Sequence, residues 1–317
     1  MRAIQITSLG GPDAVELVDV PEPVAPHLVK IEVKAAGVSF PDLLHTRGLY
    51  QIRPELPFTP GIEVAGVVVT APEGSGFAPG DRVAALTQVG GFAEQVLADP
   101  DDVFALPDEV GFEAGAALPL NYLTAYFALV ERGRLAEGEI VLVHGAAGGI
   151  GTAAIQMAKA FGAGEVIAVV STEAKAEAAR AAGADRVVLA DGFLDAVGKD
   201  SVDLVVDPVG GDRFTDSLRT LRADGRLLVI GFTAGEIPQV KVNRLLLNNI
   251  SVVGVGWGEY VRQRPGHAAV EWAAMVPHLR GGALDPLVGA TYPLAQASVA
   301  LRSIENREVT GKAVLIP

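Results

Sequence analysis

The residues best suited to bind a ligand lie in the sequence VLVHGAAGGIG, from Val141 to Gly151. The β-branched run at 141–143 predicts a buried strand, and apolar residues at helical spacing from Ile150 onward predict a helix directly after it. A glycine turn between a strand and a helix points the free N–H groups of the helix toward a phosphate. This order of elements predicts a dinucleotide site, although a strand–helix turn without a ligand has a similar sequence.

The glycines of this turn have separate tasks in such a site. We expect Gly148 and Gly149 to let the backbone approach a pyrophosphate closely, and Gly151 to let the helix pack tightly against its strand. The cofactor-binding residues expected in the turn are Ala147, Gly148, Gly149 and Ile150.

The end of the next predicted strand, Val166–Val170, indicates which dinucleotide binds. NAD-binding units carry an Asp or Glu about 20 residues after the glycines, which holds the ribose 2′-hydroxyl. This chain instead has Ser171 and Thr172, followed by Lys175. Hydroxyl groups and an ammonium can bind a 2′-phosphate, so the sequence favours NADPH over NADH. Against this interpretation, Glu173 lies close by, and Lys175 could be a solvated helix charge.

The composition limits the class of protein. Of the 317 residues, 50% are hydrophobic and 20% are charged, and the net charge is −13. An acidic chain is a poor partner for nucleic acid, which binds basic surfaces. No apolar run reaches the roughly 18 residues that a transmembrane helix needs, and no signal peptide is predicted. Because the chain has no cysteine, disulfides and thiolate-bound zinc are excluded, and we expect a cytoplasmic protein without a membrane partner.

The pattern of elements changes near residue 120. Before it, strand patterns at 29–35, 62–69 and 82–86, separated by Pro and Gly clusters, predict a small β-barrel. After it, helix and strand patterns alternate, which is typical of a parallel, doubly wound α/β sheet. The expected helices lie at 121–131, 150–161, 173–182 and 213–222, and the expected strands at 140–143, 166–170, 186–189, 203–206, 226–231 and 250–255. Two amphipathic helices, about 268–280 and 294–306, and a strand at Lys312–Ile316 follow.

Six segments, by their order and spacing, resemble the medium-chain dehydrogenase/reductase superfamily, and within it the zinc-independent quinone oxidoreductases similar to zeta-crystallin. They are AAGVSFPDLLHTRGLY (35–50), PFTPGIEVAGVV (57–68), GDRVAAL (80–86), GGFAEQV (90–96), LPLNYLTAYFAL (118–129) and VTGKAVLIP (309–317). The resemblance implies a GroES-like β-barrel catalytic domain at 1–120 and a Rossmann NADP-binding domain at 121–258. Residues 259–317 are then expected to complete the catalytic domain. A homodimer is also implied, and the strand at 250–256 is a candidate to pair across its two-fold axis.

The resemblance also bears on metal binding. Zinc-dependent members of the superfamily place a Cys at the position of Ser39, a His at that of Ile62 and a Cys or Asp near Leu120. These three residues are not a plausible ligand set, since zinc binds thiolate, imidazole or carboxylate. We therefore expect no metal. Without a Lewis acid to stabilise an alkoxide, alcohol oxidation is disfavoured, and hydride transfer to a quinone or an enone remains.

Further cofactor contacts are implied residue by residue. Lys175 matches a family lysine that binds the 2′-phosphate, and Arg307 matches an arginine with the same role that reaches over from the other domain. A family tyrosine that usually assists them is replaced by Ala190. At the end of a later strand, backbone atoms of Gly231 and Phe232 could contact the nicotinamide ribose.

The expected substrate pocket consists of Ser39, Leu44 and Tyr50. Tyr50 matches a family tyrosine that faces the nicotinamide, whereas Leu44 replaces a second tyrosine and Ser39 replaces the usual asparagine. The pocket is therefore more apolar than is usual in the family. Tyr50 is the candidate catalytic residue, which bonds to the acceptor carbonyl or relays a proton. The alternative is that Tyr50 forms an apolar wall and solvent supplies the proton.

These features predict a zinc-independent, NADPH-dependent oxidoreductase that transfers a hydride to a quinone or an α,β-unsaturated carbonyl. The cofactor carries the hydride chemistry, and the protein orients the acceptor. Two alternatives remain. One is an enoyl-thioester or 2-alkenal reductase, and the other is an NADPH-binding redox sensor or structural protein without turnover.

Five other residues have side chains that could take part in chemistry or binding. We expect His45 at the surface or just behind the pocket, His144 packed in the interior, and Asp207 as a carboxylate that stabilises a turn. Trp257 and Trp272 are expected to be core or subunit-contact residues rather than substrate platforms.

Overall fold

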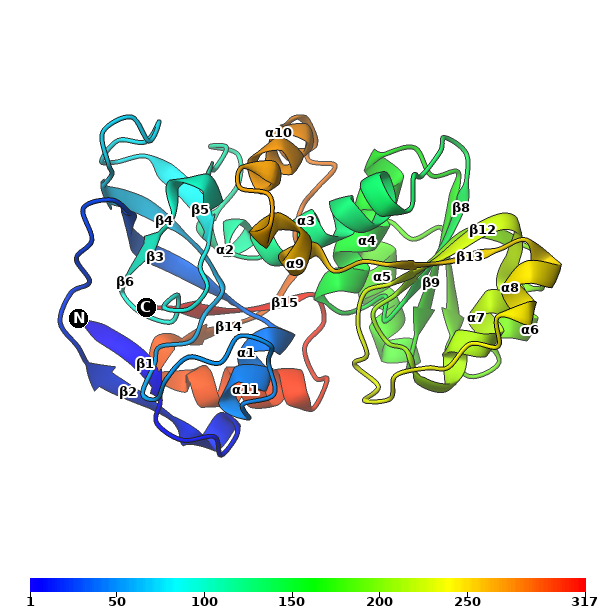
Figure 1. Ribbon diagram of the computed structural model, residues 1–317, viewed down its shortest axis with the longest axis horizontal. Helices are drawn as coiled ribbons and strands as arrows, with labels where there is room; N and C mark the ends of the chain where they lie inside the picture. The colour runs from blue at the N-terminus through cyan, green and yellow to red at the C-terminus, as the bar shows by residue number, and fades with distance from the viewer. The chain divides into compact units, whose positions relative to one another are not determined.

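The computed structural model describes residues 1 to 317, and contacts within the chain divide them into two compact units (Figure 1). The N-terminal unit contains Met1–Leu120, Pro265–Gly281 and Pro286–Pro317. The central unit contains Asn121–Arg264 and Gly282–Asp285. None of the helices combines the length and the apolar composition that crossing a bilayer requires.

The central unit is built around a six-stranded parallel sheet. Its strands are β8 (Ile140–His144), β9 (Glu165–Val170), β10 (Arg186–Leu189), β11 (Val202–Asp207), β12 (Leu221–Val229) and β13 (Ser251–Gly254). Their order across the sheet is β10-β9-β8-β11-β12-β13. The first strand along the chain therefore lies in the middle, and the order reverses between β8 and β11. This is the Rossmann arrangement, in which ligands bind beyond the carboxyl ends of the strands at the reversal.

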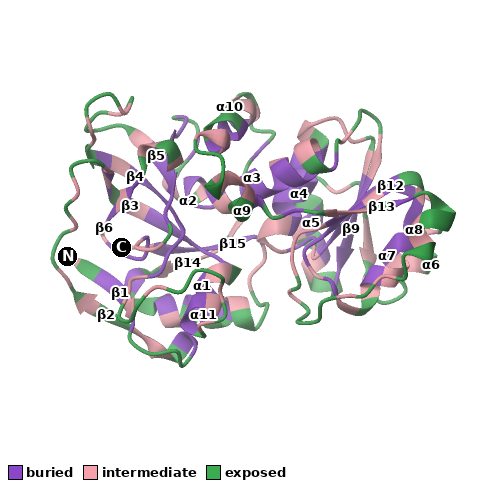
Figure 2. Ribbon diagram, viewed as in Figure 1, coloured by how far each residue is buried: buried purple, intermediate pink, exposed green.

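Helices pack on this sheet, and its buried Val, Leu and Ile residues lie in the four inner strands β8, β9, β11 and β12. The helices are α3 (Pro119–Tyr126) with a π-helical continuation at Phe127–Arg132, α4 (Gly149–Ala160), α5 (Ala176–Ala181), α6 (Phe193–Val197), α7 (Phe214–Thr220), α8 (Asn243–Asn248) and α9 (Trp257–Arg262). Helix α4 packs on β8 and β9, and its residues 151–158 are all buried (Figure 2). The chain thus holds the helix after the glycine turn firmly against the two central strands.

The N-terminal unit is built around a mostly antiparallel sheet of seven strands. They are β3 (Val29–Val38), β4 (Glu63–Thr70), β5 (Arg82–Leu86), β6 (Gln95–Ala98), β7 (Val103–Ala105), β14 (Val288–Pro293) and β15 (Lys312–Ile316). Strand β15 lies between β14, to which it is parallel, and β3, to which it is antiparallel. Strands β1 (Arg2–Ile6) and β2 (Val15–Asp19) form a separate pair. The helices are α1 (Phe40–Thr46), α2 (Phe112–Gly115), α10 (His267–Arg280) and α11 (Ala297–Glu305).

The structure corrects the expected strand at 226–231. Strand β12 begins at Leu221, which already pairs with Val202 of β11. The chain then bulges before Arg226, and Asp224 takes a positive φ of 65°. The sequence prediction placed Leu221 and Arg222 in the helix expected at 213–222, whereas α7 ends at Thr220. The Asp–Gly pair at 224–225 is typical of a turn rather than of a strand. Helices α6, α8 and α9, and the strand β14, were not expected either; the three helices have six residues or fewer, too few for a clear helical period.

The expected second boundary also differs from the observed division. Residues 259–264 belong to the central unit because α9 continues past that point and the ring of Tyr260 packs 4.7 Å from that of Phe127. Residues 282–285 belong there because Gln156 of α4 binds the backbone of Asp285. The Gln156 amide donates to the Asp285 carbonyl (2.6 Å), and its oxygen accepts from the Asp285 N–H (2.8 Å).

Candidate functional site

The turn after β8 leaves backbone N–H groups available at the start of α4. Gly145 takes a left-handed φ of 58°, which reverses the chain directly after the strand. Gly148 precedes the first helical residue, and no side chain caps the helix. The first N–H groups of a helix lack partners within the helix, and an anion is a good partner for them. This end of α4 can therefore receive a phosphate.

Two glycines of this turn pack closely against neighbouring residues, Gly151 against backbone and Gly149 against a side chain. A Cβ atom on Gly151 would lie 2.2 Å from the carbonyl oxygen of Gly145 and 2.6 Å from Cα of Ala146, both of them backbone atoms. On Gly149 it would lie 2.3 Å from the side-chain nitrogen of Asn121. By contrast, a Cβ on Gly148 would meet its nearest neighbour at 3.4 Å. Of the two tasks expected of these glycines, the packing role of Gly151 is visible in these distances. The residues of the turn fit a dinucleotide.

The residues expected at the 2′-phosphate follow β9. Ser171 and Thr172 are exposed, and Lys175 is half-buried at the end of a short 3-10 helix, Glu173–Lys175. None of the ion pairs in the structure involves Lys175, so its ammonium can bind an anion. Glu173 is also exposed, and its carboxylate is solvated rather than buried beside the ammonium.

The loops after β11 and β12 are joined by hydrogen bonds. Asp207 is buried, and its Oδ1 accepts from the N–H groups of Val209 and Gly210, both at 2.9 Å, which is the turn-stabilising role expected for it. Thr233 donates to the carbonyl of Pro208 through both its N–H (3.2 Å) and its hydroxyl (3.1 Å). Gly231 is half-buried and Phe232 is exposed, and both follow β12 at the carboxyl edge of the sheet.

His144 is a packed interior residue, as expected. Its Nε2 lies 2.8 Å from the hydroxyl of Ser217, and its ring meets that of Phe193 edge-on, with 5.0 Å between the centroids. Burial, followed by the charge of Arg213, lowers the pKa of His144 to about 3. The ring is therefore neutral at physiological pH and offers no proton for catalysis.

In the N-terminal unit, Tyr50 lies in the loop after α1 and is half-buried. Its ring centroid is 4.7 Å from that of His45, in an edge-on contact. Burial and then the charge of Asp42 raise the pKa of Tyr50, which keeps its hydroxyl protonated. His45 is 2% exposed, so the alternative that placed it at the surface is wrong. Leu44 is half-buried on the same helix.

Ser39 is the third residue expected in the substrate pocket, and its surroundings were not foreseen. It is 5% exposed and lies directly before α1. Its hydroxyl donates to Oε1 of Glu63 (2.8 Å) and accepts from the ammonium of Lys312 (2.5 Å). Lys312 also donates to the same Oε1, and both charged side chains are almost fully buried. Oε2 of Glu63 accepts from the N–H of Leu120 (2.9 Å).

A second buried carboxylate, Asp42, adjoins this group. Its two oxygens accept from the N–H groups of Ser39 (2.8 Å) and Gly61 (3.1 Å). Burial raises the pKa of Asp42 to about 7, because desolvation outweighs these hydrogen bonds and the attraction of Lys312. We call Ser39, Asp42, Glu63 and Lys312 the buried polar cluster. Sequence reasoning missed three of its four members, although a Glu and a Lys at the starts of otherwise apolar strands were a detectable signal.

Comparison with known proteins now bears on these two sites. The family model described as the alcohol dehydrogenase GroES-like domain matches residues 25–108, and that of the zinc-binding dehydrogenase matches residues 149–275. Quinone oxidoreductase-like protein 2 of Bos taurus is 36% identical over 321 residues, which cover 99% of this chain and 92% of that protein. The chain belongs to the quinone oxidoreductase-like family of the medium-chain dehydrogenase/reductase superfamily.

Solved structures of this family agree in fold. A probable oxidoreductase from Mycobacterium abscessus has a TM-score of 0.91 and 47% identity, covering 100% of this chain and 99% of that one. The quinone oxidoreductase from Thermus thermophilus, also solved as its complex with NADPH, has a TM-score of 0.86 and 37% identity, with both chains covered completely. The GroES-like and Rossmann expectations are thereby confirmed.

One family model carries zinc in its description, so we tested whether the residues here fit a metal. The side chains of Ile62 and Leu120 have no ligand atom, and the N–H of Leu120 is already bonded to Glu63. The hydroxyl of Ser39 is bonded to the ammonium of Lys312, and this fixed positive charge repels a second cation. The residues at the family's zinc position therefore do not fit zinc.

The remaining residues singled out in the sequence lie as follows. Arg307 is exposed and takes a left-handed φ of 57°. Trp257 and Trp272 are both buried; Trp272 stacks on Phe104 with 4.9 Å between the centroids and donates to the carbonyl of Ala105 (3.1 Å).

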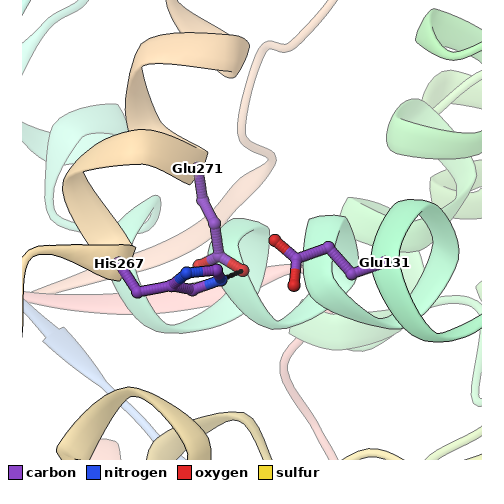
Figure 3. A group of neighbouring side chains, drawn as sticks. All are labelled: Glu131, His267 and Glu271. Atoms are coloured by element: carbon purple, nitrogen blue, oxygen red, sulfur yellow. Dashed lines mark ion pairs between the residues drawn. The ribbon is translucent and has the colours of Figure 1, made fainter. Parts of the chain in front are cut away.

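On the same helix as Trp272, His267 lies one turn before the buried Glu271, with 3.6 Å between Nε2 and Oε1 (Figure 3). This pair was not among the residues predicted from the sequence to have a role.

Proposed function

We propose that this chain is a zinc-independent, NADPH-dependent reductase that transfers a hydride to a quinone or an α,β-unsaturated carbonyl. The observation that carries the proposal is the pairing of an intact dinucleotide turn with a buried ammonium at the family's metal position. Membership of the quinone oxidoreductase-like family supports it. With a lysine in place of a metal, no Lewis acid stabilises an alkoxide, so alcohol oxidation is disfavoured. The remaining substrates are hydride acceptors that delocalise the negative charge themselves.

NADPH would be held by backbone and side-chain groups described above. The N–H groups at the start of α4 and the backbone of residues 147–150 would bind the pyrophosphate, and Ser171, Lys175 and Arg307 the 2′-phosphate. Gly231 and Phe232 would contact the nicotinamide ribose through backbone atoms. When bound, the cofactor supplies the hydride, while the protein positions the acceptor and excludes water.

Tyr50 is the proposed hydrogen-bond donor on the acceptor side. Its raised pKa keeps the proton on the hydroxyl. Removing one donor to a developing oxyanion costs a hundredfold or more in a dedicated oxyanion hole, and about tenfold is expected where solvent assists. We expect Tyr50→Phe to lower kcat/KM by about tenfold and to leave the dissociation constant of NADPH unchanged. An unchanged kcat/KM with the best acceptor would show that the Tyr50 hydroxyl is not used and that the ring only forms an apolar side of the pocket.

The proposal as a whole is tested by a panel of acceptors, with oxidation of NADPH followed by absorbance. Quinones and enones should be reduced, and crotonyl-type thioesters should be reduced more slowly. Faster reduction of the thioesters would identify an enoyl-thioester reductase, and tight NADPH binding without turnover would favour a sensor. The zinc content of the active protein should lie well below one equivalent, and a chelator should not alter the rate. Loss of activity that added zinc restores would contradict the metal-free assignment.

A homodimer is part of the same proposal. Strand β13 pairs only with β12 and forms an edge of the central sheet, so its outer hydrogen-bonding groups can pair with a second copy. Val242, Leu246 and Leu247 next to it in sequence are each more than 70% exposed. We expect a dimer in light scattering, which Leu246→Lys with Leu247→Lys weakens. Val270→Lys, a similarly exposed position on α10, is the control and should leave the dimer intact.

A further inference from the structure

The hydroxyl of Ser39 can change its hydrogen-bond acceptor without leaving the Glu63 carboxylate oxygen unpaired. In the structure its hydroxyl donates to Oε1 of Glu63, and the same oxygen also accepts from Lys312. If the Ser39 proton turned to another acceptor, Oε1 would still be bonded to the ammonium. A buried carboxylate oxygen with a single donor would instead resist such a change, because an unpaired buried charge is costly.

Lys312 makes Ser39 a stronger donor. The Ser39 oxygen accepts a hydrogen bond from a buried ammonium at 2.5 Å. A hydroxyl that accepts from a cation donates more strongly, since hydrogen bonds in a chain polarise one another. In a site of low polarity this polarisation is weakly screened. Lys312 therefore increases the hydrogen-bonding strength of the Ser39 hydroxyl toward whichever acceptor it binds.

The rest of the cluster fixes this arrangement. Glu63 is held at its other oxygen by the N–H of Leu120. Lys312 and Glu63 approach closely only because residue 37 is a glycine: a Cβ there would lie 2.8 Å from Cγ of Glu63 and 2.9 Å from Cε of Lys312. It would also lie 2.3 Å from the carbonyl oxygen of Ala116. The charges are therefore held in place before any acceptor binds, which is the condition for electrostatic catalysis.

We propose that Ser39 donates a hydrogen bond to the acceptor oxygen as negative charge develops there, with Lys312 and Glu63 as positioning residues that polarise and orient it. The inference rests on the proposed function, which places Ser39 in the acceptor pocket. No bond to Ser39 forms or breaks. The cluster stabilises the charge that follows hydride transfer, at the place where zinc-dependent relatives use a metal.

The test compares two acceptors of different electron demand, an enone and a readily reduced benzoquinone. Ser39→Ala should lower kcat for the enone by about tenfold or more, with the NADPH dissociation constant unchanged. The loss should be smaller for the benzoquinone, whose earlier transition state carries less charge on oxygen. Ser39→Thr, which retains the hydroxyl, should recover most of the rate.

The positioning residues are tested without leaving a buried charge. The double variant Lys312→Met with Glu63→Gln removes both charges, and its kcat should fall about as far as that of Ser39→Ala, with the same dependence on acceptor. Adding Ser39→Ala to it should cause little further loss, since all three residues act through one hydroxyl.

The outcomes separate this inference from the function on which it rests. If the wild type turns over both acceptors and Ser39→Ala loses the same factor in kcat with each, or loses none, the inference is wrong and the proposed function stands. A lower melting temperature in the double variant with unchanged kcat overturns it too, since the cluster would then be purely structural. Absence of wild-type turnover with every acceptor overturns the proposed function and this inference with it.

Discussion

The two units of the molecule build their polar sites in opposite ways. In the central unit, the turn after β8 is a surface of backbone N–H groups, made by leaving side chains out at Gly149 and Gly151. In the N-terminal unit, the buried polar cluster is made of charged side chains that compensate one another. The glycine turn is therefore damaged by substitutions that add a side chain, and the buried polar cluster by substitutions that remove a charged group. Substitutions of each kind can test this contrast.

The largest effect is expected from Lys312→Met. It leaves the fully buried Glu63 without its counter-charge, and breaking a buried ion pair in this way costs about 3–5 kcal/mol. The free energy of unfolding, measured by urea titration, should fall by that amount. The double variant with Glu63→Gln should regain most of it, and Lys159→Met, which breaks an exposed pair with Asp185, should cost no more than about 1 kcal/mol. Equal stability of the single and double variants would contradict the assignment.

Asp42 should make the N-terminal unit less stable as the pH rises. Its carboxyl titrates near its ordinary value in the unfolded chain and at about 7 in the folded protein. Between these values the folded protein binds a proton that the unfolded chain has lost, so raising the pH from about 4 to 7 lowers the free energy of unfolding, by at most about 4 kcal/mol.

This pH dependence is isolated by Asp42→Asn. Unfolding of the variant measured from pH 4 to 8 should lack the decline, apart from a constant loss because an amide cannot accept both backbone N–H groups. Asp108→Asn, whose parent side chain is 96% exposed, is the control and should retain it. Identical pH profiles for wild type and Asp42→Asn would show that Asp42 is ionised throughout.

Gly151→Ala tests the opposite kind of site. The added methyl group would overlap backbone atoms of Gly145 and Ala146, which cannot move independently of β8. Overpacking of this kind costs about 1–3 kcal/mol, and we expect weaker NADPH binding as well. Gly258→Ala is the matched control, since a Cβ there meets nothing within 4 Å and the residue lies outside β13. Comparable thermal stability of the two variants would mean that the turn adapts.

The smallest effect concerns the choice of cofactor. Lys175→Ala and Arg307→Ala should each weaken NADPH binding by about tenfold, because a charge-assisted hydrogen bond contributes about 1.5–3 kcal/mol before screening by solvent. Binding of NADH, which lacks the 2′-phosphate, should not change. Fluorescence titration with both nucleotides measures this, and equal dissociation constants for NADPH and NADH in the wild type would refute both assignments.

The contrast between the units also explains what the sequence could predict. The turn at 145–151 was predicted in place because strand, glycines and helix are contiguous, and residues close in sequence stay close in space. Glu63 and Lys312 are 249 residues apart, and only the pairing of β3 with both β4 and β15 brings them together. No local period records such a contact. The doubly wound sheet was predicted from its repeating strand–helix pattern, and the GroES-like and Rossmann domains from the family resemblance. The bulge in β12 and the short helices α6, α8 and α9 were not predicted, because each is too brief to show a period.

The position of β15 has a consequence for how the chain folds during synthesis. This strand adjoins β3 in the sheet of the N-terminal unit and carries Lys312 at its start. Until residues 312–316 have left the ribosome, β14 lacks its partner strand and Glu63 lacks its counter-ion. The central unit, whose sheet is complete at Gly254, is made in the meantime. The N-terminal unit therefore begins synthesis first, but its sheet is completed only after the central unit has been synthesised. Until β15 forms, Ser39 and Glu63 lack the hydrogen bonds that Lys312 donates to them.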